Sequence, residues 1–404
     1  MDVAIIGGGA SGFFSAIAVK ENFPNANVVI FEKSTKLLSK VSVSGGGRCN
    51  VTNGCTSIKE LSKAYPRGEK QLQKAFQIFN TKHAFEWFES RGVPLIIQDD
   101  NCVFPKSQKS QSIIDCLMNQ INILGVEIKL EHGIKSINPL NEKLQLEFTN
   151  EKIPTKIFDK VIVASGGSPK REGFNWLEKL NHKIENPVPS LFTFNMPNET
   201  ITSLMGIVVE KSIVSIQGTK LKSEGPLLIT HWGMSGPAIL KLSSFGARIL
   251  SENNYKFNVQ VNWINITNND FVLNELKSIA IENANKILSN AKPFLLPERL
   301  WLFILEKCEL PSTKKWKEVG KNGMNKLVSL LTNDVYSVEG KTTFKEEFVT
   351  CGGVSLESID FRTMQSKVCK NLYFTGEVID VDGITGGYNF QAAWTTAFIA
   401  GKLN

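Results

Sequence analysis

Six residues near the start of the chain have the types and the spacing of a loop that binds a dinucleotide. The segment Gly7-Gly8-Gly9-Ala10-Ser11-Gly12 fits the pattern G-x-G-x-x-G. In such a loop Gly7 permits a tight turn, Gly9 lets a pyrophosphate approach the backbone, and Gly12 lets the next helix pack closely on the sheet. The unpaired N–H groups at the start of that helix attract phosphate oxygens. The segment therefore predicts a dinucleotide site.

A carboxylate at a suitable distance supports this prediction. Glu32 follows the β-branched run Asn27–Phe31, about twenty residues after the glycine loop. At the end of a second strand, a carboxylate accepts hydrogen bonds from the ribose hydroxyls of the adenosine half. A glycine turn in an α/β protein that binds no nucleotide is the alternative, and the position, the flanking residues and the acid argue against it.

Motifs further along the chain favour FAD over NAD. The aromatic strand Asn371–Phe374 ends in Thr375-Gly376-Glu377, and in flavoproteins of the two-dinucleotide-binding type such a strand end brings a carboxylate to the ribityl hydroxyls. Gly386-Gly387-Tyr388-Asn389 leads into the last helix, whose free N–H groups can face the flavin N1 and C2 oxygen, where charge collects on reduction. The turn Ala164-Ser165-Gly166-Gly167 resembles one that passes near FAD in the same class. We therefore expect non-covalent FAD.

The residues expected to contact FAD come from these motifs and from the loop Ser44–Asn53. Arg48 could pair with a phosphate or with an anionic substrate, and Asn50 could bond the ring or the ribityl chain. Asp382 could bind cofactor hydroxyls, although acids in a glycine-rich loop often serve only to form turns. The full predicted set is Gly7, Gly9, Ala10, Ser11, Gly12, Glu32, Lys33, Lys40, Ser44, Gly45, Gly46, Arg48, Cys49, Asn50, Ile134, Ala164, Ser165, Gly166, Gly376, Glu377, Asp382, Gly387, Tyr388 and Asn389.

Three side chains are candidates for catalysis. A Cys49 thiol beside a reduced flavin could donate a proton to the carbon opposite the hydride, as general acid catalysis of C=C reduction requires. Tyr388 could supply a proton or stack on the ring, and His231 could face the flavin from the substrate side. Each has a structural alternative: a small packing residue in a tight loop for Cys49, a structural aromatic for Tyr388, and a turn or packing residue for His231.

The elements that position these residues follow from the hydrophobic pattern. Val3–Ile6, Ala10–Lys20 and Asn27–Phe31 predict strand, helix and strand. The apolar run Val161–Ala164 predicts a buried parallel strand. Residues 70–92 and 108–124 each predict an amphipathic helix, and the segment Asn389–Gly401 predicts the last helix.

After Pro187 and Pro189 the pattern changes. Residues 191–263 alternate in short runs typical of strands, residues 268–331 predict several helices, and Thr342–Val349 alternates again. We therefore predict an α/β protein with three parts. They are a discontinuous Rossmann-like FAD-binding domain of the two-dinucleotide-binding type (residues 1–190 and 350–404), an inserted β-barrel-like domain (191–265 and 336–349) and a small helical domain (266–335).

Composition restricts the class of protein and its location. The seven cysteines are scattered without a CxxC pair, so a disulfide framework or a zinc ribbon is not expected. The four histidines are not spaced as ligands, so no metal is predicted. No apolar run reaches the ~20 residues of a membrane span, and the start of the chain lacks the basic region of a signal peptide. We expect a cytoplasmic protein without a membrane partner.

The formal net charge is +7, with Lys and Arg dense in residues 59–74, 106–109 and 314–326. A basic surface of this kind attracts polyanions. Solvated helix and loop faces are the plainer interpretation of the same pattern, and the sequence leaves both open.

A rare string indicates a family. Ser44–Asn53, together with Thr230–Ala238, Thr350–Val354, Thr363–Lys367 and Gly376–Gly383, resembles the BaiN/RdsA (YhiN-like) family of bacterial FAD-dependent oxidoreductases almost from end to end. The resemblance implies an FAD domain, a β-barrel-like insertion and a nested helical domain. The chain departs from the family in a short loop at residues 168–173 and in Cys351, where a small residue is common. Cys351 could pair with Cys49 if the two lie close.

The resemblance also implies a reaction. We expect reduction of an activated C=C bond, either in a small enone-type substrate or in uridine of structured ribosomal RNA, where the product is dihydrouridine. Since only one full G-x-G-x-x-G is present, NAD(P)H is expected to reach the flavin directly and transiently, or oxygen reoxidises the flavin. A flavin amine oxidase that produces hydrogen peroxide and a non-catalytic FAD-binding module remain as alternatives.

Overall fold

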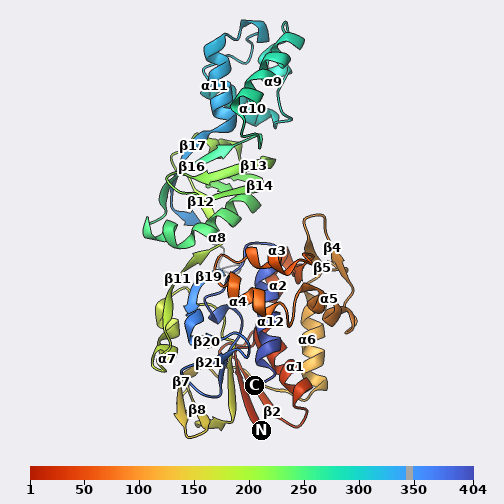
Figure 1. Ribbon diagram of the computed structural model, residues 1–404, viewed down its shortest axis with the longest axis vertical. Helices are drawn as coiled ribbons and strands as arrows, with labels where there is room; N and C mark the ends of the chain where they lie inside the picture. Colours follow the sequence, from red (N-terminus) through yellow and green to blue (C-terminus); the bar gives the residue numbers. More distant parts are fainter. Residues whose placement is uncertain (343–348) are drawn as a thin grey trace. The chain divides into compact units, whose positions relative to one another are not determined.

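The computed structural model describes residues 1–342 and 349–404, and its contacts divide the chain into two units (Figure 1). The first unit contains residues 1–190 and 349–404, and the second contains residues 191–342. The predicted border after residue 190 coincides with this division. The predicted strand Thr342–Val349 lies largely outside the described residues, and Val349 begins a strand of the first unit instead of ending the insertion.

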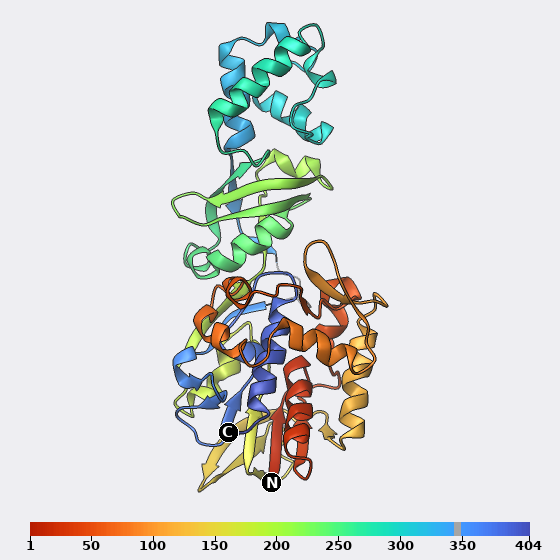
Figure 2. The ribbon, with the colours of Figure 1, turned by 45° about the vertical axis from the view of Figure 1, so that its right-hand side comes forward.

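Parallel strands form the centre of the main sheet of the first unit (Figures 1 and 2). Their order is β6 (Glu127–Lys129), β2 (Asn27–Phe31), β1 (Asp2–Ile6), β10 (Lys160–Val163) and β22 (Leu372–Phe374). The hairpin β20 (Ile359–Asp360) and β21 (Gln365–Ser366) extends it in the antiparallel sense. Ile5 pairs with Ile162, which pairs with Tyr373. All three side chains are buried, as parallel strands covered on both faces require.

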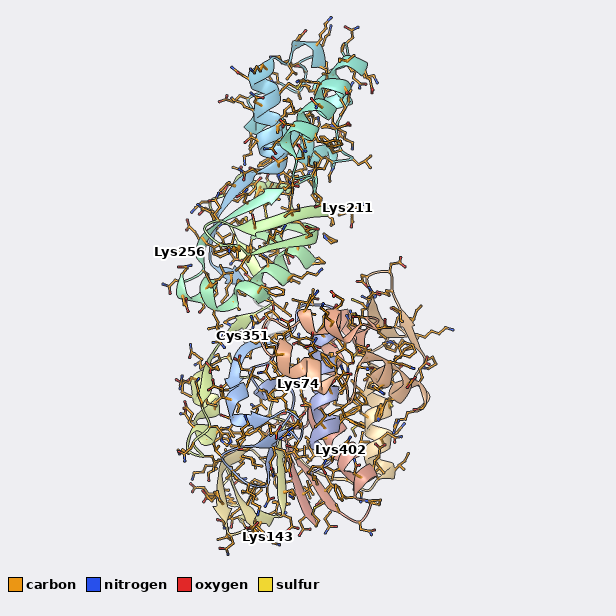
Figure 3. All side chains as sticks on the ribbon, in the orientation of Figure 1. Lys74, Lys143, Lys211, Lys256, Cys351 and Lys402 are labelled. Atoms are coloured by element: carbon orange, nitrogen blue, oxygen red, sulfur yellow. The ribbon has the colours of Figure 1, made fainter. Side chains whose placement is uncertain are left out.

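Smaller elements connect this sheet to the rest of the first unit. β11 (Ile184–Ser190) pairs with β19 (Val349–Val354), the strand that carries Cys351 (Figure 3). This unit also contains α2 (Ser39–Gly47), β3 (Thr52–Asn53), α3 (Ile58–Lys63), β4 (Leu95–Ile97), β5 (Cys102–Pro105), β7 (Ile134–Leu140), β8 (Lys143–Phe148), β9 (Lys156–Phe158) and α7 (Asn175–Glu178).

The prediction of a single helix over residues 70–92 is wrong. The segment forms α4 (Glu69–Ala75) and α5 (Thr81–Glu89) instead. Asn80 causes the break, because its side chain accepts hydrogen bonds from two N–H groups of the first turn of α5. In return, the ring of His83 accepts from the N–H of Asn80. This reciprocal cap starts a new helix.

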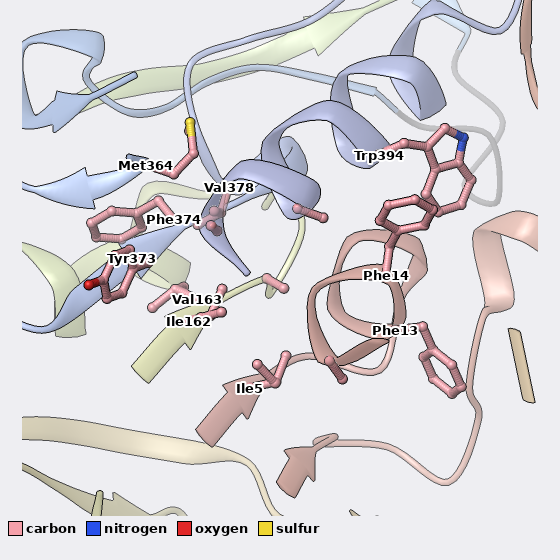
Figure 4. Close-up of a cluster of buried hydrophobic side chains, with 14 of the residues drawn as sticks. Ile5, Phe13, Phe14, Ile162, Val163, Met364, Tyr373, Phe374, Val378 and Trp394 are labelled. Carbon is pink, nitrogen blue, oxygen red and sulfur yellow. The ribbon is translucent and has the colours of Figure 1, made fainter. Parts of the chain in front are cut away.

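The core of the first unit joins its first helix to its last. α1 (Ala10–Asn22), α6 (Gln111–Ile123) and α12 (Tyr388–Ala400) are its long helices, and α1 packs against both of the others. Phe14 of α1 and Trp394 of α12 lie side by side, with ring centroids 5.3 Å apart (Figure 4). Because α1 carries the glycine loop at its start and α12 carries the Gly387 motif, this packing brings two distant motifs to the same sheet.

The second unit is built on an antiparallel sheet. Its order is β17 (Asp334–Glu339), β16 (Lys256–Asn262), β13 (Val208–Ile216), β14 (Lys222–Thr230), β15 (Gly233–Ser235), β12 (Thr193–Asn195) and β18 (Lys341–Thr342). β17 pairs with β16, β18 pairs with β12, and only Gly340 separates β17 from β18. One chain segment therefore carries both edge strands of this sheet, and the barrel-like form of the insertion stays a prediction. α8 (Pro237–Glu252) packs on β13 and β14.

Helices α9 (Asn269–Glu282), α10 (Glu298–Lys307) and α11 (Lys321–Thr332) follow the predicted pattern over residues 268–331. Trp263, after β16, donates its indole N–H to Asp334 over 3.0 Å, and Lys307 of α10 binds the same carboxylate. The contacts keep these helices in the same unit as the antiparallel sheet, whereas the prediction separated residues 266–335.

Candidate functional site

The glycine loop has the geometry of a diphosphate cradle. Gly7 has a φ of +116°, and a Cβ built on it would overlap the carbonyl oxygen of Ala164, while a Cβ on Gly12 would overlap the carbonyl oxygen of Gly7. Only glycine fits these two positions. A Cβ on Gly9, in contrast, meets nothing within 4 Å. The backbone at Gly9 is therefore open on the side where a diphosphate would approach, at the start of α1, so the residues fit the predicted cofactor.

Glu32 lies beside this loop, directly after β2. Its Oε2 accepts from the N–H of Gly8 over 2.8 Å, and its Oε1 accepts from the N–H of Ser34 over 2.9 Å. The backbone of Glu32 is also bonded to the segment before β7, because the N–H of His132 donates to its carbonyl oxygen over 2.8 Å. The half-buried Ile134 begins β7 two residues later. The structure thus brings Glu32 into contact with the glycine loop, and Lys33, which follows it, is exposed.

Two further strand ends meet the start of α1. The N–H of Ala164 donates to the carbonyl oxygen of Ile6 over 2.8 Å, which places the turn after β10 against the glycine loop. A Cβ built on Gly376, directly after β22, would lie 2.5 Å from the hydroxyl oxygen of Ser11. In open α/β sheets, ligands bind at this carboxyl edge of the strands. The predicted residues 164–166 and 376 therefore converge on the edge that also carries the glycine loop.

Glu377 is held from two sides. Its Oε1 accepts from the N–H of Thr350 over 2.9 Å, and its Oε2 forms an ion pair of 2.5 Å with Lys40 of α2. The Glu377 side chain is 19% exposed and that of Lys40 50%. Each carboxylate oxygen keeps a second lone pair, so the predicted contact between Glu377 and the ribityl chain stays a prediction.

The loop after α2 lies across the start of α12. A Cβ built on Gly387, which has a φ of +85°, would overlap the carbonyl oxygen of Thr52. Thr52 donates its hydroxyl to the side chain of Gln391 over 2.5 Å, and the indole N–H of Trp394 donates to the carbonyl oxygen of Val51 over 2.9 Å. No side chain caps α12. Its first N–H groups have no side-chain acceptor, and their predicted contact with the flavin N1 and C2 oxygen stays a prediction.

Arg48 and Asn50 of this loop rest on a hairpin that sequence reasoning missed. The guanidinium of Arg48 lies 4.1 Å from the centre of the Phe104 ring on β5, and Asn50 Oδ1 accepts from the N–H of Val103 over 3.2 Å. The thiol of Cys102, on the same strand, interacts with the side chain of Asn50. Nothing in the sequence signals this support, because β5 lies fifty residues away from the loop and carries no motif.

Cys49 is enclosed by the fold. Its side chain is fully buried, and burial raises the pKa of its thiol to about 12, although a hydrogen bond with Ser44 acts in the opposite direction. The thiol stays protonated at neutral pH and bonds to Ser44 within its own loop, which fits the packing alternative better than proton donation. None of the seven cysteines, all in the described part of the chain, forms a disulfide, so Cys49 and Cys351 are not paired.

Tyr388 is less enclosed than Cys49. It is half-buried in the first turn of α12, and burial raises the pKa of its hydroxyl to about 12. The hydroxyl of Tyr65 donates to its carbonyl oxygen over 2.7 Å, which fixes the backbone. Asn389, in contrast, uses its side-chain amide to bind both the N–H and the carbonyl of Gly383. These two bonds hold the Asn389 side chain against the loop before α12, and its predicted contact with the cofactor stays a prediction.

Asp382 has a different role from the one predicted. Its side chain is fully buried, and Arg67 binds both carboxylate oxygens, with Nε 2.5 Å from Oδ1. The hydroxyl of Ser190 donates to Oδ2 over 2.7 Å. Burial raises the pKa of Asp382, against the opposing effects of Arg67 and Ser190. Because three donors from Arg67 and Ser190 already bind its two oxygens, Asp382 supports the loop that precedes α12 instead of offering these oxygens to a cofactor hydroxyl.

His231 belongs to the second unit. It is exposed between β14 and β15, and its ring lies 4.0 Å from that of Trp232, edge to face. This contact fits the turn role that we named as the alternative, and the predicted role on the substrate side stays a prediction. Among the residues that the structure describes, no group of three His, Cys, Asp or Glu side chains is arranged to hold a metal ion. No helix in the described ranges combines the length and apolarity that crossing a membrane requires.

Comparisons with known proteins match this chain over its whole length. The family model described as HI0933-like protein Rossmann domain matches residues 1–403. A 3-dehydro-bile acid delta(4,6)-reductase from Clostridium scindens is 25% identical over 417 residues, which cover 99% of this chain and 98% of the reductase. A ribosomal RNA dihydrouridine synthase from Escherichia coli is 28% identical, over 98% of this chain and 96% of the synthase.

Solved structures share the fold at low identity. A 3-ketosteroid delta1-dehydrogenase from Sterolibacterium denitrificans, in complex with 1,4-androstadiene-3,17-dione, superposes with a TM-score of 0.52 at 10% identity, over 99% of this chain and 98% of the dehydrogenase. A 3-ketosteroid-delta4-(5alpha)-dehydrogenase from Rhodococcus jostii gives a TM-score of 0.51 at 9% identity, over 99% and 96% of the two chains. Together with the family match, these similarities confirm the predicted Rossmann-like fold and family resemblance.

Proposed function

The chain belongs to the HI0933-like family of proteins with a Rossmann domain, and on this premise we propose that it is an FAD-dependent oxidoreductase that reduces an activated C=C bond. The observation that carries the proposal is the convergence of three motifs at one edge of the main sheet. The loop Gly7–Gly12, the turn after β10 and the strand end at Gly376 contact one another there. Each of the three contains glycine, which lets the backbone of a dinucleotide-binding site approach its ligand closely.

In the proposed complex, the start of α1 binds the diphosphate and Glu32 binds the adenosine ribose. The start of α12, which no side chain caps, faces the flavin N1 and C2 oxygen, where negative charge develops on reduction. The bound flavin supplies hydride transfer. The chain itself must then provide a proton, and Tyr388, protonated at neutral pH and half-buried at that helix start, is the side chain that we favour for this task.

Two relatives carry names that support a reductase. One is named as a reductase of a bile acid and the other as a synthase of dihydrouridine in ribosomal RNA. Both names describe the reduction of C=C bonds that are conjugated with a carbonyl group. We therefore propose a substrate with a polarised C=C bond, and we favour this class over the oxidation of small amines and over a non-catalytic FAD-binding module.

Exposed lysines support an RNA substrate over a small enone. Lys59, Lys63, Lys70 and Lys74 lie exposed on or next to α3 and α4, and Figure 3 labels Lys74. Lys63 has a local acidic partner in Glu60, so part of this charge is neutralised. The remainder suits a polyanion. NAD(P)H as a transient reductant and a cytoplasmic location belong to the same proposal.

Anaerobic mixing of the yellow protein with NADH and with NADPH tests the reductase directly. We expect one of them to bleach the flavin rapidly, and the colour to return when an acceptor with a conjugated C=C bond is added. Absence of bleaching, with hydrogen peroxide formed from a small amine in air, would support the amine oxidase instead. For the RNA substrate, a strain that lacks the gene should lose dihydrouridine from its large ribosomal RNA, and unchanged content would exclude this substrate.

A further inference from the structure

We propose that the side-chain hydroxyl of Thr350 hydrogen-bonds the ribityl chain of FAD. Thr350 is not among the residues that the sequence motifs predict to contact FAD. The inference rests on the proposed function, because it requires FAD at the carboxyl edge of the main sheet.

The hydroxyl of Thr350 has no visible partner. Thr350 is fully buried on β19, and among the described residues no donor or acceptor lies within hydrogen-bond distance of its Oγ1. Its backbone N–H, in contrast, donates to Glu377 Oε1. Buried hydroxyls in proteins are almost always paired, since desolvation without a partner is unfavourable. This orphaned hydroxyl therefore indicates a partner that binds from outside the chain.

The hydroxyl lies at the predicted cofactor edge. A Cβ built on Gly167 would overlap Thr350 Oγ1 and would lie 2.8 Å from Glu377 Oε1. Thr350 thus packs against the turn that follows β10 and the carboxylate that follows β22. These are the strand ends beside the glycine loop, where a ligand of an open α/β sheet binds.

The ribityl chain is the part of FAD that fits best. The diphosphate has the start of α1 as its donor, and the ring edges have the start of α12. Between them lies a chain of hydroxyls, each of which can donate or accept, and the Thr350 hydroxyl has the same dual capacity. We also assign Glu377 to the ribityl chain, but each of its oxygens already accepts one hydrogen bond from the protein. The Thr350 hydroxyl would give the ribityl hydroxyls a second polar partner.

An ordered water could satisfy the same hydroxyl, and substitution distinguishes the two cases. The Thr350→Val variant keeps the shape and removes the hydroxyl, whereas Thr350→Ser keeps the hydroxyl. Thr81→Val is the matched control, because Thr81 is buried in the same unit and its hydroxyl donates to the carbonyl oxygen of Cys55 over 2.7 Å. FAD affinity is measured by fluorescence quenching with apoprotein, and thermal midpoints are measured with and without FAD.

We expect T350V to bind FAD about 5-fold to 10-fold more weakly, from the loss of one hydrogen bond. Its apoprotein should melt at or above the wild-type midpoint, since an unpaired hydroxyl is gone. T350S should bind nearly as wild type, and T81V should lower both midpoints equally without changing the affinity. If T350V does not fold, Thr350→Ala against T350S gives the same comparison.

Wild-type affinity in T350V, or an equal drop of its midpoints with and without FAD, would overturn the assignment of Thr350. Such a result would leave the proposed function intact. Failure of the wild-type protein to bind FAD at all would overturn the proposed function itself.

Discussion

Arg67 and Asp382 form a buried ion pair that joins the turn before α4 to the loop before α12. Arg67 Nε lies 2.5 Å from Asp382 Oδ1, and the two side chains are 12% and 0% exposed. The pair holds in place the chain that leads to Tyr388. Substitution of Arg67 should therefore show how much this buried contact contributes to stability.

We predict that Arg67→Met destabilises the protein by about 3–5 kcal/mol, because it leaves the carboxylate of Asp382 buried without its counter-ion. Urea unfolding of the apoprotein measures this change. Arg362→Met is the control: it breaks the ion pair with Asp360, in which Arg362 is 85% exposed, and should cost less than about 1 kcal/mol. Equal effects of the two variants would contradict the importance of burial.

Gly387→Ala should weaken FAD binding by on the order of tenfold or more, because the new methyl group collides with the carbonyl of Thr52 and displaces the start of α12. Gly92→Ala is the control, because it introduces similar backbone strain without a collision. Gly92 also has a positive φ, of +80°, but a Cβ there meets nothing within 4 Å. It should lose only about 1–2 kcal/mol of stability and keep its FAD. Cofactor content after gel filtration gives the answer.

Stability should fall on acidification because of His182. This side chain is buried, its Nε2 lies 2.8 Å from the hydroxyl of Ser366, and burial lowers the pKa of its ring from 6.5. As the pH falls below about 6.5, the unfolded chain binds the proton first, so the free energy of unfolding drops by up to about 1.4 kcal/mol per pH unit. Above this pH the contribution is constant.

The His182→Gln variant removes this titration. Urea unfolding of wild type and variant at pH 7.5 and pH 5.5 should therefore show a smaller difference between the two pH values for the variant. The same pH dependence in both proteins would assign the acid sensitivity to other groups.

Tyr388→Phe should slow the transfer of hydrogen to the acceptor without slowing the bleaching of the flavin by NAD(P)H, because it removes a proton donor. We expect a loss of about 10²-fold to 10⁴-fold in the second step. Cys49→Ala should leave both steps almost unchanged and lower the thermal midpoint, since its side chain packs in the core. Stopped-flow measurements of the two half-reactions distinguish the residues, and the reverse pattern would restore Cys49 as the donor.

Local signals in the sequence predicted much of this protein. The glycine loop with Glu32, the buried apolar strands and the Gly387 helix start depend on neighbouring residues in the chain, so their structure is visible in the chain alone. Asn80 shows the limit of periodicity: apolar residues continue at helical spacing through residues 70–92, but a side chain that caps the backbone overrides the pattern and starts a new helix.

Tertiary structure alone decided which distant residues share a site. Arg67 binds Asp382 and Arg48 contacts Phe104, although 315 and 56 residues separate the members of these pairs. Thr350 donates its N–H to Glu377, 27 residues further along, while its hydroxyl meets no partner among the described residues. The enclosed position of Cys49 likewise favours the packing alternative that the sequence left open. Pairing and desolvation depend on the whole packed core, and no short stretch of sequence contains that information.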